Sequence, residues 1–394
     1  MQFTPLDKKA RAEWRGMLHP AQGTQLAAAA LLFFLSSLAL PLCKTEAVAG
    51  LYLVYAVIFY YMLTHSLAAI VSVGLPGMAL YGVSTLVPTL PHPFLMPAVY
   101  AALVLGGVGG GFLVLQCREK KYLPLFALPV AAYAIAAALS GPYLALCVLI
   151  PSALSLVLGH GMLTCRPQTP VLVTLAGALA VIGMSALLVW YGLCGWPVAN
   201  PFAYFGELVR GGVTGFCRTA IELYAAQGMA LPLSETDIYN LSAMLGNILP
   251  GLFLAGCGVL SFVIYRTYLR ALTAWGTLSR VPLRIGAMTV SPLAAGLFLL
   301  ATLCALFGGA GIFGTVCENL TLVLEPALVL VGVTSLFTPD PKRGSRISVL
   351  LLILLVVLLL NYPTLALSAA ALLGAVRILL AAILGLRGKK NANK

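Results

Sequence analysis

The sequence predicts an all-α protein, a polytopic bundle of about 12 transmembrane helices (range 10 to 12) with both termini in the cytoplasm. Of its 394 residues, 61% are hydrophobic and 9% are charged, whereas charged residues make up about a quarter of a typical soluble domain. The mean hydropathy is +1.02. A helix needs about 20 apolar residues to cross the hydrocarbon layer, and such runs fill nearly all of the chain after Gln25. No room remains for a sizeable soluble domain.

The apolar runs, separated by short polar breaks, predict where the spans lie. We expect them near residues 26–43, 47–64, 67–88, 94–116, 123–139, 143–163, 171–194, 240–265, 286–309, 316–337, 347–361 and 364–386. The region 47–88 admits a second interpretation, a broken helix, because Gly74, Pro76 and Gly77 interrupt it. The first run is longer than the 7 to 15 apolar residues of a signal peptide, so we expect it to be an uncleaved span.

The positions of the basic residues predict the orientation of the spans, because short cytoplasmic loops carry an excess of Lys and Arg. With the N-terminus inside, 19 of the 23 basic residues fall in inner segments. Those segments lie within 8–15, 118–121, 166, 266–284, 342–346 and 387–394. The net charge of +12 follows from this bias and favours contact with anionic membrane lipids. We therefore expect no nucleic-acid partner.

One long excursion divides the spans into two groups. We expect a cytoplasmic N-terminal segment at 1–25, a first transmembrane group at 26–194, the excursion at 195–239, a second transmembrane group at 240–388 and a basic tail at 389–394. Ser234 is a good N-cap residue, and acidic residues suit the first turn that follows it. The end of the excursion therefore predicts a second, short helix that begins at Ser234.

The excursion itself predicts an amphipathic helix at the outer membrane interface. At 100° per residue, four charged residues gather on one side and apolar residues fill the other. The charged residues are Glu207, Arg210, Arg218 and Glu222, and the apolar face holds Phe202, Phe205, Val209, Val213, Phe216, Ala220 and Leu223. Such a helix lies in the interface or caps the bundle. A static helix, a mobile lid and a re-entrant loop all remain open at this stage.

Two charges lie inside apolar segments that must cross the bilayer, Glu325 and Arg377. A charge at that depth costs roughly 2.5 to 3.5 kcal/mol on insertion scales, so it usually faces protein, a partner or a wet cavity. The two depths differ by about 6 Å at 1.5 Å per residue, which predicts an ion pair. Pro326 would free nearby backbone groups, and Asn247 would add a polar contact. Glu325, Arg377 and Asn247 are our candidates for a ligand or ion pathway. A pair that only fixes helix packing, and unpaired charges that snorkel or face a partner, are the alternatives.

Glycines occur in clusters within the predicted spans. Residues 106–111 contain five glycines, and we expect them to allow close helix packing rather than to bind substrate. A second cluster at 308–314 predicts a tight external turn. The nine cysteines include no CxxC pair, and the four histidines are dispersed. We expect no metal site and no cofactor.

The stretch from ELVRGGVTGFCRTAIELYAAQG through NLSAMLGNILPGLFLAGCGVLSFVIYRTYLRAL resembles the YybS-like family of predicted bacterial membrane proteins. In that family an extramembrane helical excursion precedes a span with a central proline, here Pro250, and then a basic inner segment, here 266–284. The resemblance covers about 200–390. It implies a bacterial cytoplasmic (inner) membrane location and a fold distantly similar to the substrate-binding subunits of energy-coupling-factor transporters. It therefore implies a role in small-molecule uptake.

Three classes of function follow from these patterns. We expect first a protein for small-molecule transport or membrane-embedded ligand binding, because the buried charges need a partner. The alternative is a non-transporting scaffold of an envelope, division or shape-determining complex, and the third is a membrane-embedded enzyme. The sequence has no HExxH, GxSxG, paired intramembrane aspartates or P-loop, so we do not expect catalysis. A transporter of this kind would use a partner ATPase or an ion gradient.

Overall fold

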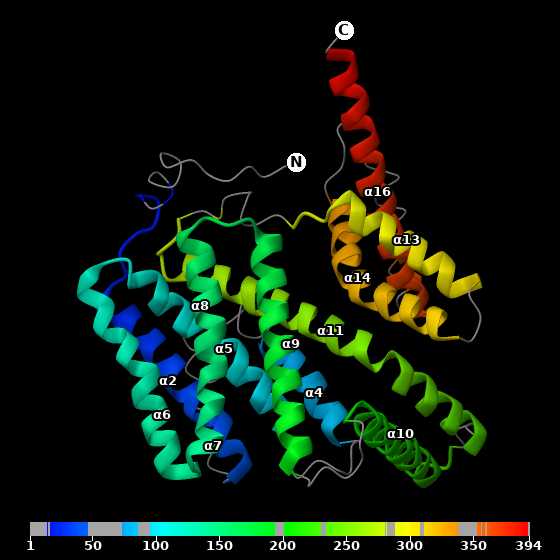
Figure 1. Ribbon diagram of the computed structural model, residues 1–394, viewed down its shortest axis with the longest axis horizontal. Helices are drawn as coiled ribbons and strands as arrows, with labels where there is room; N and C mark the ends of the chain where they lie inside the picture. The colour runs from blue at the N-terminus through cyan, green and yellow to red at the C-terminus, as the bar shows by residue number, and fades with distance from the viewer. Residues whose placement is uncertain are drawn as a thin grey trace. The chain divides into compact units, whose positions relative to one another are not determined.

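The computed structural model confirms the all-α class for the residues that it describes (Figure 1). The structure describes residues 14, 16–45, 73–85, 95–193, 201–229, 234–279, 281, 288–307, 311–337, 353–355, 357–358 and 361–392. The chain divides into two compact units. The larger unit holds residues 2–246 and 260–287, and the smaller holds 247–259 and 288–394.

Eight described helices are long and apolar enough to cross a membrane. They are Gly23–Leu42, Leu95–Gln116, Lys120–Ser140, Pro142–Leu163, Gln168–Val189, Glu235–Ala274, Ile312–Thr334 and Thr364–Leu384. Each coincides with an expected span, and the chain is an integral membrane protein. The expected spans at 47–64 and, for the most part, 347–361 lie outside the described residues. A total of about 12 spans and the cytoplasmic location of both termini stay predictions.

The larger unit is built around helix α5 (Leu95–Gln116), which packs against α2 (Gly23–Thr45) and α8 (Leu149–Leu163). Most of α5 is buried, including all five of its glycines. At Gly109 an added Cβ would lie 2.8 Å from the Ala29 carbonyl oxygen, so only glycine permits this approach of α2. The close packing expected of the 106–111 glycines is confirmed.

The other helices of this unit cover that centre. Helix α4 (Leu75–Thr85) contacts α5, and α9 (Gln168–Leu193) contacts α8. Two expected spans are composite. The 123–139 span consists of a 3₁₀ turn, η2 (Lys120–Phe126), and α6 (Ala127–Ser140), and the 143–163 span consists of α7 (Pro142–Ala145), η3 (Leu146–Val148) and α8. Pro124 lies inside η2, and Pro142 starts α7 because proline suits the first turn of a helix.

The N-terminal segment meets the last turn of α8 and two loops that were predicted to be cytoplasmic, at one end of the larger unit. The contacts run from Trp14 Nε1 to Met162 O (2.7 Å), from Arg118 Nη2 to Leu18 O (2.7 Å) and from His19 N to Thr277 O (3.0 Å). Trp14 and Leu18 are buried. Their proximity supports the predicted orientation, in which these segments share one side of the membrane. Which side it is stays a prediction.

Labelling of Cys117 tests on which side of the membrane these segments lie. Its thiol is half-buried and donates to the Tyr122 carbonyl at 3.4 Å, and burial raises the pKa of the thiol. Since the thiolate is the reactive form, maleimide labelling of a variant with Cys117 as its single cysteine should be slow at neutral pH. The rate should keep rising with pH above about 8.5, the usual thiol pKa. Labelling should require access to the cytoplasmic face.

The control for Cys117 is a cysteine at Lys120, which is exposed in the same loop, in a background that lacks Cys117. It should react faster at neutral pH and from the same side. Labelling of either cysteine by an impermeant reagent in intact cells would contradict the predicted orientation.

Helix α11 (Glu235–Ala274) corrects the prediction of a short helix at Ser234. Ser234 does cap it: its Oγ accepts from Asp237 N at 3.1 Å, and Asp237 Oδ2 accepts from Ser234 N at 2.9 Å. The helix then continues for 40 residues with Pro250 inside it, so no break separates the capped first turn from the span expected at 240–265. Its length of about 60 Å is twice the hydrocarbon thickness, so α11 extends beyond the bilayer.

The smaller unit contains α13 (Pro292–Phe307), α14 (Ile312–Phe337) and α16 (Pro363–Ala392), which all pack on one another (Figure 1). Their core is made of Ala295, Phe298, Leu328, Ala371 and Ala375. Helix α13 begins later than the expected residue 286, because Ser291 accepts from Ala294 N at 3.1 Å and Pro292 starts the first turn. Gly314, expected in a turn, lies within α14; residues 308–310 are outside the described part.

Candidate functional site

Glu325 lies at the middle of α14, and its side chain is half-buried. Its Oε1 accepts a hydrogen bond from Ser368 Oγ on α16 at 3.1 Å. Ser368 is exposed, so the contact is open on one side of the three-helix group. Pro326 follows directly inside the helix. The structure thus places a carboxylate and a hydroxyl together in two membrane-spanning helices.

Arg377 lies on the same helix as Ser368, nine residues further along. Ser368 and Arg377 are therefore about 13.5 Å apart along the axis of α16. The sequence predicts a difference of about 6 Å in depth between Glu325 and Arg377. Arg377 is exposed on α16. The ion pair between the two charges stays a prediction.

Asn319 is a polar residue of this unit that the sequence patterns did not single out. Its Nδ2 donates to Asn247 O at 3.1 Å and to Thr315 O at 2.8 Å, while its Oδ1 accepts from Gly251 N at 2.6 Å. In a regular helix the Gly251 N–H bonds the Asn247 carbonyl. The Asn319 carboxamide therefore bonds the donor and the acceptor of one backbone hydrogen-bond pair in α11, beside Pro250. With the bond to Thr315 O, both Nδ2 hydrogens and the Oδ1 acceptor of Asn319 are used.

The predicted contact of Asn247 is thus made by its main chain, and its side chain is exposed. A signal for Asn319 was present, because a carboxamide within an apolar span needs a partner. It lies six residues before Glu325, about 9 Å along α14. Helix α14 therefore contacts α11 through Asn319 and, about 9 Å further along, α16 through Glu325.

The amphipathic helix expected in the excursion is α10 (Pro201–Ala226). Glu207, Arg218 and Glu222 are exposed, while Arg210 is half-buried. Arg210 Nη1 bonds Glu207 Oε1 at 2.8 Å, and Arg218 Nη2 lies 3.5 Å from Glu235 Oε2 of α11. Because both are largely solvent-exposed pairs, each contributes at most about 1 kcal/mol. A re-entrant loop without helix is ruled out for these residues.

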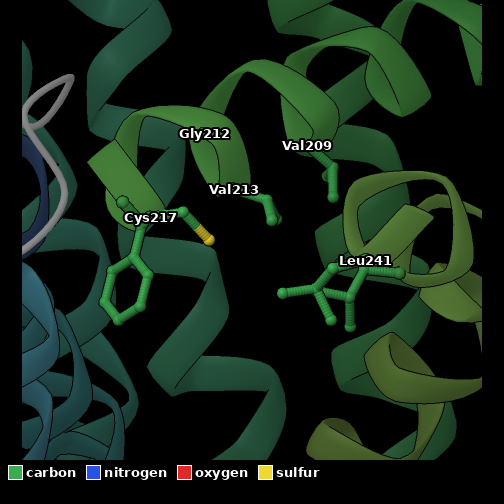
Figure 2. Close-up of a pocket in the computed structure, with 7 residues that line it drawn as sticks. Val209, Gly212, Val213, Cys217 and Leu241 are labelled. Carbon is green, nitrogen blue, oxygen red and sulfur yellow. The ribbon is translucent and has the colours of Figure 1, made fainter. Parts of the chain in front are cut away.

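The apolar side of α10 faces the first turns of α11 across a groove of about 350 Å³ (Figure 2). Its walls are Val209, Gly212, Val213, Phe216 and Cys217 of α10 with Leu241 and Leu245 of α11. Val209, Val213 and Cys217 point into the space that Leu241 faces. Of the predicted apolar face, Val209, Val213 and Phe216 line this groove, whereas Leu223 is exposed. The side chains of Phe202 and Phe205 lie outside the described residues.

In the described part of the chain, no group of three or more His, Cys, Asp or Glu side chains is arranged to hold a metal ion. Comparisons with protein-family models, curated proteins and solved structures found nothing that matches this chain.

Proposed function

We propose that this protein binds a small molecule or ion within the membrane and moves it across, with Glu325 as the ligand-binding carboxylate. The observation that carries the proposal is the position of Glu325: the middle of a membrane-spanning helix, half-buried and bonded to Ser368 on one side. A carboxylate facing lipid at that depth is costly, so the open side of the contact is expected to meet a polar ligand or water. A proton, a metal cation or an amine-bearing solute has the complementary charge.

The resemblance to the YybS-like family supports the same proposal. It favours a bacterial cytoplasmic membrane protein that takes part in small-molecule uptake, and energy would come from a partner ATPase or an ion gradient. The polar contact of Asn319 with α11 beside Pro250 adds a second site where helix backbone is engaged at membrane depth.

The test is native mass spectrometry of gently purified protein, together with Glu325→Gln. Glutamine keeps an acceptor for Ser368, so the free energy of unfolding should change by less than about 1 kcal/mol. Loss of the negative charge should reduce retention of a cationic small molecule at least tenfold, a change of about 1.4 kcal/mol in binding. Glu222→Gln on α10 removes one exposed charge elsewhere and should leave retention unchanged.

Two results would contradict this function. Equal ligand retention in Glu325→Gln and the unaltered protein would remove Glu325 from the site. A stable complex with envelope proteins and no retained small molecule would favour the scaffold.

The Glu325→Gln/Arg377→Met double variant tests the predicted ion pair. If the two residues pair, Arg377→Met alone lowers the folded yield, and adding Glu325→Gln restores much of it.

A further inference from the structure

Cys304 and Cys317 lie near the connected ends of α13 and α14. The two helices pack on each other, and only residues 308–311 separate them in the chain, so they run antiparallel. Cys304 comes three residues before the last residue of α13, and Cys317 comes five residues after the first residue of α14. At 1.5 Å per residue these positions are about 4.5 Å and 7.5 Å from the connected helix ends. Both cysteines therefore lie at nearly the same level of the hairpin.

The two thiols meet between the helices. Cys304 follows the buried Ala301 by three residues on α13 and is itself half-buried. Cys317 shares one face of α14 with Leu324 and Leu328, which pack in the core of the smaller unit. The Cys317 thiol is 7% exposed and forms a hydrogen bond with the Cys304 thiol. The fold thus brings two free thiols from neighbouring helices into contact.

The position of the pair along α14 places it near one membrane surface. The helix has 26 residues, a length of about 39 Å, which exceeds the hydrocarbon thickness of about 30 Å. Its first turns therefore lie close to the interface. In the predicted orientation this end of the hairpin faces away from the cytoplasm. Disulfides form and persist in oxidising extracytoplasmic compartments, whereas cytosolic thiols stay reduced.

We propose that Cys304 and Cys317 are a disulfide site that links α13 to α14 covalently. The oxidant is a molecule of the extracytoplasmic space that carries a reactive disulfide. The thiolate of Cys304, the less buried of the two, attacks one sulfur of that disulfide, and the other sulfur leaves and takes up a proton. The thiolate of Cys317 then attacks Sγ of Cys304 in the mixed disulfide and releases a second thiol. The two cysteines lose two protons and two electrons, and the oxidant gains them.

The link would fix the register of α13 against α14, the helix that carries Glu325. The reaction needs no ligand at Glu325. Its outcome is therefore measured independently of the proposed function.

Two variants form a matched pair. The first keeps Cys304 and Cys317 and has alanine at the other seven of the nine cysteines. The second carries in addition Cys317→Ala and Val316→Cys. Val316 is 57% exposed, and the shift by one residue rotates the thiol by about 100° around α14, away from Cys304. Thermal unfolding in detergent checks that both variants fold.

The measurement uses intact cells, which are reduced with dithiothreitol and then treated from outside with oxidised glutathione. Intact mass of the alkylated protein distinguishes an internal disulfide, free thiols and glutathione adducts. The first variant should form the internal disulfide and return to two free thiols with dithiothreitol. The Val316→Cys variant should form none. In the unaltered protein, peptide mapping without reduction should find Cys304 joined to Cys317, a result that does not depend on the folding of any variant.

Two free thiols in the first variant after oxidation would overturn the proposal and leave the cysteines as packing residues. A stable glutathione adduct on Cys304 would do the same, because it would show that the Cys317 thiol does not reach the mixed disulfide. Equal disulfide formation in the Val316→Cys variant would show that the contact seen in the hairpin does not select the pair. A disulfide that forms in detergent but not in intact cells would place the pair away from the oxidising side and overturn the proposal as well.

Discussion

Gly332→Ala should destabilise the protein by about 1 to 3 kcal/mol, the usual range for overpacking a buried contact. An added Cβ at Gly332 would overlap the Ala370 carbonyl oxygen and lie 3.2 Å from Gly374 N. These are backbone atoms of α16, which cannot rotate away as a side chain can. Helices α14 and α16 would have to separate, and Ser368 would move away from Glu325. Thermal unfolding in detergent measures the loss.

The control for Gly332 is Gly296→Ala on α13. A Cβ at Gly296 meets no atom within 4 Å, and alanine is favoured over glycine in a helix by up to about 1 kcal/mol. Gly296→Ala should therefore be neutral or stabilising, opposite in sign to Gly332→Ala. Equal effects of the two substitutions would show that α14 and α16 do not approach closely at Gly332.

Asn319→Leu should lower the free energy of unfolding by about 2 kcal/mol. The change removes the bonds to Asn247 O and Gly251 N, and each hydrogen bond between membrane helices contributes about 0.6 to 2 kcal/mol. The leucine also leaves no polar group beside Pro250, where the α11 backbone lacks one donor. We further expect α11 to become more mobile there, measured as faster hydrogen exchange around residue 251.

Thr321→Val serves as the matched change on the same helix, because the Thr321 hydroxyl donates to Cys317 O of α14 itself at 3.0 Å. Its loss should cost less than about 1 kcal/mol and should leave exchange in α11 unaltered. If Thr321→Val and Asn319→Leu had the same effect on α11, the Asn319 contact would not hold the helix.

The apolar runs predicted eight described spans because a membrane helix needs only length and hydrophobicity, both of which are local. The amphipathic pattern of α10 was equally visible, since a periodic arrangement of charges defines its two faces. The start of α11 at Ser234 was also predictable from the cap. Its length was not, because a long helix and two helices with a break differ little in local pattern.

Composition and periodicity by themselves determined that this is an all-α membrane protein, and they identified Glu325 as a charge needing a partner. Only the tertiary structure decided that the carboxylate meets Ser368, that the Asn319 carboxamide engages α11, and that α10 and α11 leave an apolar groove between them. The hydrogen bonds of Glu325 and Asn319 join residues 43 to 72 positions apart. Their register depends on where helices cross, which is set by small residues such as Gly332 and by backbone approach rather than by hydrophobicity.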